Sequence, residues 1–180
     1  MEKGRYLFII LIGLFVFTSS AGVMAQSNVP LNTLRERVEF HFFTPELIEQ
    51  TYLQVTEPKF LDSAKPITLV QLDYFAQESD QLSLTVTQHR ARGHLIVKEK
   101  RKSDQFERHK NTKKIVEEFK FNKNEGVAVE INKHNGRFIR WDDQAYPGGV
   151  LRWVQNETFI ELKSTVLNKE QLIEIAENMK

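Results

Sequence analysis

The chain has 180 residues, no cysteine and a formal net charge of +1 from 25 basic and 24 acidic side chains. The absence of cysteine excludes a disulfide scaffold, a lipoprotein-type acylated cysteine, thiol catalysis and a zinc site with cysteine ligands. The nearly balanced charge indicates no particular class of partner.

The first 25 residues predict export. A positively charged start is followed by an apolar run over residues 7–17 and by small residues that suit a cleavage site after Ala25. This pattern favours a secretory signal peptide at residues 1–25. The alternative is an uncleaved membrane anchor, because the segment 6–25 is long enough to cross a bilayer.

The rest of the chain has the size of one ordinary domain with its own hydrophobic core. We expect a leader at residues 26–37 and a single domain at residues 38–180. Its charge is unevenly distributed, because residues 98–123 carry 10 basic and 5 acidic side chains while the flanking segments are net acidic. Residues 98–123 are called the basic island below and are interpreted as an insertion.

The opening of the chain after the leader has competing patterns. Residues 31–43 begin with apolar side chains at every fourth position, which favours a short helix, but their second half alternates, which favours a strand. The sequence Thr44-Pro45-Glu46 predicts a helix start, with Thr44 as N-cap and Pro45 at the first helical position. That helix would be short, since residues 52–56 are typical of a strand.

Strand-like segments separated by polar turns follow. Residues 67–75 and 82–87 are rich in β-formers or alternate cleanly, and residues 77–81 between them predict a hairpin turn. Residues 94–97 are expected to continue this meander in the same sheet. Residues 113–121 are ambiguous between strand and helix.

Two further hairpins are predicted in the second half of the chain. Residues 127–131 and 137–141 flank Asn135-Gly136, a dipeptide suited to the positive φ angles of a tight turn. Residues 150–154 and 158–162 form the next hairpin, with a polar turn between them.

The chain is expected to end in an amphipathic helix. Asn168 is a plausible N-cap with Gln171 three positions later, and one apolar stripe runs along the helix through Leu172, Ile175, Ala176 and Met179. The stripe needs a cover, and the open face of the sheet supplies it. The sequence therefore predicts an α+β fold: a curved, half-barrel-like antiparallel sheet of about six to eight strands covered on one face by helices.

No motif for catalysis or metal binding is evident. His89 and His94 are five residues apart, which matches neither same-face spacing on a strand nor zinc spacing on a helix, so we expect solvated or hydrogen-bonded loop histidines. Asp142-Asp143 is the one adjacent carboxylate pair at a strand end, and a polar turn is the favoured interpretation. The chain has neither a G-x-S-x-G elbow nor a glycine-rich phosphate loop. We therefore expect no enzyme, no metal and no cofactor.

The basic island is the candidate surface for an anionic membrane or wall polymer. Interspersed acidic residues weaken its field, which favours a solvated loop or hairpin extension instead. Nucleic acid is a poor partner for an exported neutral domain. The candidate residues are Lys98, Lys100, Arg101, Lys102, Lys110, Lys113 and Lys114.

The abundant aromatic residues also have two interpretations. A curved sheet with many aromatic side chains could hold an apolar, lipid-like ligand, as binding pockets are lined mainly by such groups. Burial in an ordinary core is the more common role of these residues.

The C-terminal pattern resembles a known family. A tryptophan strand, a short turn, an aromatic strand and a helix, over residues 149–162 and 167–177, are similar to the ending of an extracytoplasmic domain of unknown function in Firmicutes. That domain often forms the outer part of anti-sigma-factor-like membrane proteins. Residues 38–55 are similar to its opening, although Leu47-Ile48-Glu49 lacks a proline that the family usually has. The residues that carry the C-terminal match are Trp153, Phe159, Leu162, Leu172, Ile175 and Ala176.

The resemblance implies a non-catalytic envelope domain, distantly similar to the half-barrels of lipoprotein carriers and periplasmic sigma-regulatory sensors. Our first hypothesis is accordingly a secreted or envelope binding or sensory domain that engages a lipid-like ligand or another envelope protein. Electrostatic attachment to an anionic membrane or wall polymer is the alternative, and an envelope hydrolase is third. Because only residues 1–6 precede the apolar run, we expect the outer module alone.

Overall fold

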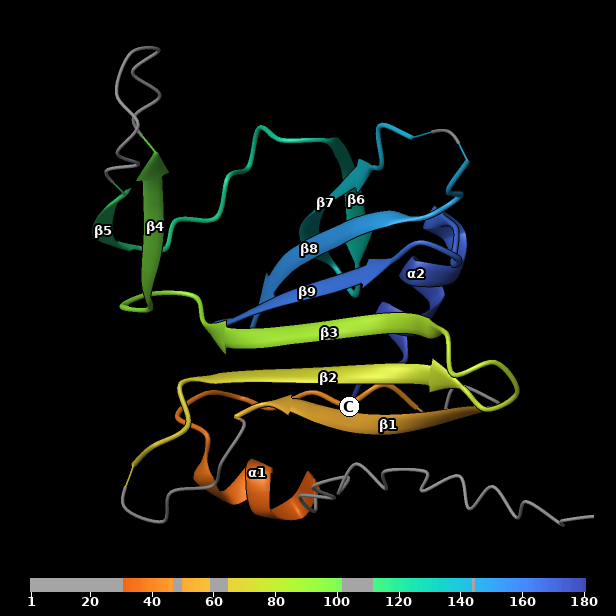
Figure 1. Ribbon diagram of the computed structural model, residues 1–180, viewed down its shortest axis with the longest axis horizontal. Helices are drawn as coiled ribbons and strands as arrows, with labels where there is room; N and C mark the ends of the chain where they lie inside the picture. Colours follow the sequence, from red (N-terminus) through yellow and green to blue (C-terminus); the bar gives the residue numbers. More distant parts are fainter. Residues whose placement is uncertain (1–30, 47–49, 59–64, 102–111, 144) are drawn as a thin grey trace, which may run out of the picture.

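The computed structural model describes residues 31–46, 50–58, 65–101, 112–143 and 145–180, with the backbone alone for residues 98–101, 112 and 113. Two helices and nine strands are present in these ranges (Figure 1). In chain order they are α1 (Leu31–Arg37), β1 (Thr51–Glu57), β2 (Leu69–Ala76), β3 (Leu82–Arg90), β4 (Leu95–Arg101), β5 (Thr112–Glu118), β6 (Val127–Ile131), β7 (His134–Arg140), β8 (Gly149–Gln155), β9 (Thr158–Ser164) and α2 (Lys169–Glu177).

Seven strands form one open antiparallel sheet in the order β1-β2-β3-β9-β8-β7-β6. Strands β4 and β5 pair only with each other and stand apart as a two-stranded sheet (Figure 1). The α+β prediction is confirmed. The expectation that residues 94–97 continue the meander is wrong, because the edge of β3 is taken by β9 and β4 turns away from the sheet. The ambiguous segment 113–121 is a strand in its first part, β5.

One face of the seven-stranded sheet is apolar and is called the inner face. Alternation along each strand directs side chains to opposite faces, and register aligns the apolar ones across neighbouring strands. Leu72, Val86, Leu162 and Leu151 form such a row across β2, β3, β9 and β8, and all four are fully buried. This row lies at the centre of the hydrophobic core.

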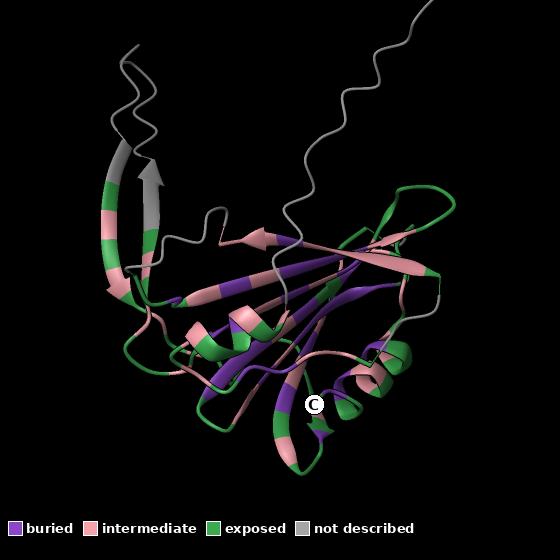
Figure 2. Ribbon diagram, turned by 90° about the horizontal axis from the view of Figure 1, so that it is seen from below, coloured by how far each residue is buried: buried purple, intermediate pink, exposed green. Residues whose placement is uncertain are grey.

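The inner face is covered by α1, by residues 38–46 and by α2 (Figure 2). The short-helix prediction for residues 31–43 is confirmed at α1, whose Leu34 is fully buried. The segment assigned to a leader, residues 26–37, therefore contributes part of the core. Residues 26–30 lie outside the described ranges.

Hydrogen bonds from the sheet and the C-terminus hold residues 41–44 on the inner face. The buried Gln88 side chain accepts from the Phe43 amide at 2.9 Å and donates to the Phe43 carbonyl at 2.7 Å. Thr44 and Lys180 exchange two backbone hydrogen bonds at 2.7 and 3.0 Å. Residues 44–46 do not start a helix as predicted, because the Thr44 carbonyl, which would accept the first helical hydrogen bond, accepts from the Lys180 amide instead. Residues 47–49 lie outside the description.

The C-terminal helix α2 matches its prediction closely. Asn168 and Gln171 form a reciprocal capping box, with two hydrogen bonds of 2.9 Å each. Leu172 and Ala176 are buried, and Ile175 packs against the core. Met179 is also buried, two residues beyond the helix end.

The hairpin predicted around Asn135-Gly136 has a different register. The turn is Asn132-Lys133, with φ of 48° and 67°, and Ile131 pairs with His134 across it. Gly136 lies inside β7, where an added Cβ would be 3.1 Å from the Arg152 carbonyl oxygen. Gly136 is paired with Val129 and Trp153 in the sheet, so it is a strand residue and not a turn residue.

The hairpin between β8 and β9 is confirmed. Its two turn residues, Asn156 and Glu157, both have positive φ, at 47° and 60°, as a tight two-residue turn requires. Within the described ranges, no helix is long and apolar enough to cross a membrane. The predicted signal segment 1–25 lies outside them.

Candidate functional site

The outer face of the seven-stranded sheet carries polar side chains at one end and aromatic side chains at the other. At the polar end, Asp73, Thr85 and Lys163 are register partners on β2, β3 and β9. Gln71, Thr87 and Glu161 form the next row on this face. Both rows stand opposite the inner-face row that contains Leu72, because side chains alternate along a strand.

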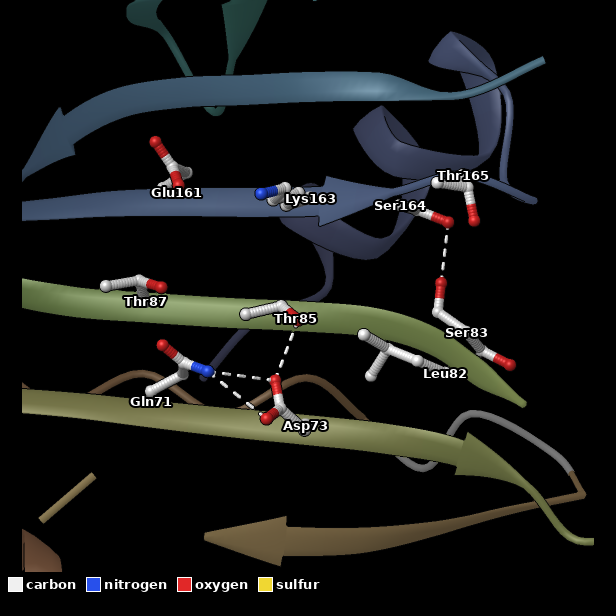
Figure 3. A pocket seen from close by; sticks show the side chains of 10 residues that line it. All are labelled: Gln71, Asp73, Leu82, Ser83, Thr85, Thr87, Glu161, Lys163, Ser164 and Thr165. Atoms are coloured by element: carbon white, nitrogen blue, oxygen red, sulfur yellow. Dashed lines mark hydrogen bonds between the residues drawn. The ribbon is translucent and has the colours of Figure 1, made fainter. Parts of the chain in front are cut away.

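A groove of about 340 Å³ lies over this polar end and is called the polar groove (Figure 3). It spans the three neighbouring strands β2, β3 and β9. Hydroxyl groups and charged side chains dominate its lining. The lining residues are Gln71, Asp73, Leu82, Ser83, Thr85, Thr87, Glu161, Lys163, Ser164 and Thr165.

Asp73 is the most buried charged residue in the lining of the groove, at 7% exposed. Its carboxylate accepts hydrogen bonds from Thr85 at 2.7 Å and from Thr56 at 2.9 Å. The Gln71 amide nitrogen donates to both carboxylate oxygens at 3.2 and 3.3 Å (Figure 3). Three donors compensate the desolvation of this charge and fix its orientation in the sheet.

The two other charged residues of the groove also have partners. Glu161 accepts from the Arg152 guanidinium at 2.6 Å, and Arg152 also pairs with Glu125 at 3.2 Å. The Lys163 ammonium lies 5.4 Å from the centre of the Trp141 ring. The Trp141 indole donates to the Ser164 carbonyl at 2.7 Å, which fixes the ring beside the end of β9.

The other end of the outer face carries a cluster of five rings, here called the aromatic cluster: His89, His94, Phe119, Phe121 and Phe159. His89 on β3 and Phe159 on β9 are register partners, and their rings stack at 4.8 Å. The His94 ring stacks on His89 at 3.9 Å, and Phe119 meets His89 edge-on at 4.6 Å. The cluster thus joins the sheet to the segments that flank β4 and β5.

Burial dominates the protonation of the two histidines. His89 is 4% exposed, and this burial lowers its pKa from 6.5 to about 4. The His89 Nδ1 lies 2.8 Å from the Arg90 carbonyl oxygen, a contact that fits an Nδ1–H donor. Burial also lowers the pKa of His94. Both rings are therefore neutral at pH 7, and their close stacking carries no charge repulsion.

Strands β4 and β5, called the hairpin, are attached to the sheet at this cluster. The Phe119 amide donates to the His94 carbonyl at 2.7 Å, and the Gly93 amide donates to a Glu118 carboxylate oxygen at 2.9 Å. A cleft of about 610 Å³ separates β5 from Arg152 and Glu125 on the sheet side. The hairpin therefore extends away from the sheet (Figure 1).

The hairpin exposes an aliphatic patch made of Leu95, Val97 and Val116. Val97 pairs with Val116, and Leu95 lies two residues from Val97 on the same face of β4. The three side chains are 63%, 60% and 61% exposed. Such adjacent, exposed aliphatic groups are typical of a surface that meets a partner or a membrane.

The structure places part of the basic island on this hairpin. Four of the predicted surface residues stand in the β4–β5 ladder by their backbone, and Lys114 is exposed there. Lys102 and Lys110 lie outside the described ranges. The four residues placed by backbone are Lys98, Lys100, Arg101 and Lys113.

The structure places the adjacent carboxylate pair in an exposed bend, and it describes one of two further histidines, His41 and His109. Asp142 and Asp143 are exposed in a bend, and Asp143 accepts from the Ala145 amide at 2.9 Å. His41 is exposed beside Phe43, and His109 lies outside the described ranges. Across the residues that are described, no group of three potential metal ligands occurs.

The residues of the C-terminal family pattern are mostly core residues of the inner face. Trp153, Leu162 and Leu172 are fully buried, and Ala176 and Ile175 pack beside them. Phe159 is different, because it points to the outer face and belongs to the aromatic cluster. Five residues of the pattern therefore form the core, and Phe159 packs where the hairpin is attached to the sheet.

The aromatic cluster and the polar groove were missed at the sequence level. The five-residue spacing of His89 and His94 would separate the two rings on one continuous strand. The chain instead reverses at residues 91–93, where Gly93 has φ of 72°, and this brings the rings together. The groove residues alternate with apolar ones on the β2–β3 hairpin and on β9, which comes almost 70 residues after β3 ends. Only the order of the strands brings them together.

Comparisons with known proteins give one match. A family model described as a domain of unknown function, DUF4367, matches residues 68–179. The match begins at the start of β2 and includes α2, so it covers all of the sheet except β1. No curated protein and no solved structure matches the chain.

Proposed function

Because the chain belongs to the DUF4367 family, whose function is unknown, we propose a function from its own surfaces. The protein is an exported, non-catalytic domain of the cell envelope that docks on an anionic membrane surface through the hairpin. The observation that carries the proposal is the aliphatic patch of Leu95, Val97 and Val116 on a hairpin built from the basic island. This is the electrostatic alternative of the sequence-based hypotheses, extended by an apolar contact.

The chemistry of the hairpin fits the interface of a bilayer. Basic side chains near an anionic surface contribute about 1 kcal/mol each, and the basic island has an excess of five positive charges over acidic ones. Burying an exposed aliphatic side chain contributes up to about 1.5–3 kcal/mol when burial is complete. The basic and aliphatic side chains together support reversible binding to a bilayer. A wall polymer has no apolar phase, so it would interact with the basic side chains alone.

The packing of the inner face favours this site over a lipid-like ligand held inside the fold. The space between the sheet and its cover is filled by fully buried side chains such as Leu34, Trp153 and Leu172. The described grooves and clefts open on other surfaces. An apolar ligand would have to displace the core, at a cost of several kcal/mol for each large side chain.

The export part of the proposal rests on the signal-like residues 1–25 and on the resemblance to extracytoplasmic Firmicute domains. On this basis, the protein is an outer module similar to the extracytoplasmic domains of anti-sigma-factor-like proteins. Cleavage after Ala25 would release the module, and the hairpin would return it to the membrane surface.

Vesicle flotation tests the proposal. The protein used is residues 26–180, which contain every described helix and strand. Thermal unfolding with a cooperative transition shows that this form is folded. We expect it to float with vesicles of phosphatidylcholine and phosphatidylglycerol and to remain free with phosphatidylcholine alone. Binding should weaken as salt is raised from low to physiological ionic strength.

Three double variants distinguish binding through the hairpin from a general effect of charge. Arg101→Glu/Lys114→Glu changes ladder positions that share a face with Val97 and Val116, and it should abolish flotation. Lys65→Glu/Lys133→Glu changes the same net charge at exposed positions outside the hairpin and should preserve flotation. Val97→Ser/Val116→Ser should weaken binding without changing its salt dependence. Equal flotation of both charge variants would contradict the proposal.

A further inference from the structure

The polar groove at the far end of the outer face has no role in membrane docking. We infer that it binds an uncharged saccharide, held by hydrogen bonds from β2, β3 and β9. The inference does not depend on the docking function, because the groove and the hairpin patch are formed by different residues.

The charges of the groove select against ionic ligands. Asp73 and Glu161 would repel an anion, and Lys163 is the one basic side chain that lines the groove. A cation would compete with the Thr56, Thr85 and Gln71 donors that already satisfy Asp73. The Asp73 and Lys163 charges balance across the strands, and Glu161 is paired with Arg152. A neutral, polar ligand meets none of these penalties.

The hydrogen-bonding groups suit a ligand with many hydroxyl groups. The Thr87 side chain makes no hydrogen bond to the described residues, and it lies between the Gln71 amide and Glu161 (Figure 3). The Lys163 ammonium donates only, a carboxylate accepts only, and a threonine hydroxyl does both. A saccharide hydroxyl can donate and accept at once, so it can satisfy each of these groups.

The groove is also prepared for binding before a ligand arrives. The three donors on Asp73 fix the β2 side of its floor, and strand pairing fixes the spacing of Thr85, Thr87 and Lys163. A preformed site loses little conformational entropy on binding, which compensates for the weak net gain of each hydrogen bond. A volume of about 340 Å³ is at the lower end of the range for small-molecule sites, which fits one or a few sugar rings.

The test is an NMR titration of ¹⁵N-labelled residues 26–180, which contain the whole hydrophobic core. The probes are N-acetylglucosamine trisaccharide, cellotriose and, as the anionic comparison, inorganic phosphate. We expect one trisaccharide to shift the Thr85, Thr87 and Lys163 amide resonances saturably at concentrations up to about 10 mM. Resonances from the cover of the inner face, such as those of Leu34 and Leu172, should not move.

A matched pair of isosteric variants completes the test. Thr87→Val removes the unpartnered hydroxyl and should weaken trisaccharide binding about fivefold to tenfold. Thr68→Val, an exposed threonine outside the groove, should leave binding unchanged. The inference is overturned if neither trisaccharide gives saturable shifts at the groove, if phosphate gives the same shifts, or if Thr87→Val binds as well as the parent.

Discussion

The inner and outer faces of the seven-stranded sheet differ in how they are completed. The inner face is closed by the chain itself, through α1, residues 38–46 and α2. Among the described residues, the outer face is covered at the aromatic cluster, and the polar groove is open at its other end. The residues most recognisable in sequence therefore serve mainly packing, whereas the polar groove lies on the opposite face and the aliphatic patch lies on the separate hairpin.

The largest contrast between the faces should appear in stability. Leu162→Ala removes a fully buried inner-face side chain and should lower the free energy of unfolding by about 2–5 kcal/mol. Leu82→Ala, at the exposed rim of the polar groove, should cost about 0.5 kcal/mol. Urea unfolding measures both. Similar losses would mean that the outer face is also covered.

The aromatic cluster should make stability depend on pH. Since the pKa of His89 is lowered to about 4 in the fold, the unfolded chain binds its proton first as the pH falls below 6.5. The free energy of unfolding is therefore unaffected by His89 above pH 6.5. It decreases by about 3 kcal/mol in total as the pH falls from 6.5 to 4.

His89→Phe keeps an aromatic ring in the cluster and removes this titration. The parent protein should lose about 3 kcal/mol more than the variant between pH 7 and pH 4, as measured by urea unfolding. Subtracting the variant cancels the contribution of carboxylates that titrate in the same range. Identical pH profiles would show that His89 is not buried as a neutral ring.

A smaller effect is expected where the chain reverses below the hairpin. Gly93 has φ of 72° with no atom near an added Cβ, so Gly93→Ala should cost about 1–2 kcal/mol from backbone strain alone. Thermal unfolding measures the loss. If Gly93→Ala is neutral, the reversal that stacks His94 on His89 is not held in this conformation.

The sequence predicted the parts of the fold that depend on local patterns. The capping box of Asn168 and Gln171, the turn at Asn156 and the alternation of β3 all formed as expected. Two local predictions failed. Residues 44–46 pair with Lys180 instead of starting a helix, and Gly136 pairs with Val129 and Trp153 inside the sheet while Asn132 and Lys133 form the turn.

The candidate sites were less accessible to prediction. Lys98 and its neighbours were identified from charge, but nothing in the sequence indicated that Val97 and Val116 would be exposed rather than paired in the main sheet. Likewise, Asp73 was an unremarked polar residue in a strand. Its partners Thr56 and Thr85 come from the two neighbouring strands.

The most direct test of membrane docking is the environment of the hairpin in the bound state. The chain has no cysteine, so Val97→Cys provides a single site for an environment-sensitive nitrobenzoxadiazole label, with Val166→Cys as an exposed control outside the hairpin. On anionic vesicles, the account predicts a blue shift and increased emission for the label at residue 97 and none at residue 166. Unchanged emission at residue 97 in vesicle-bound protein would contradict docking through the hairpin.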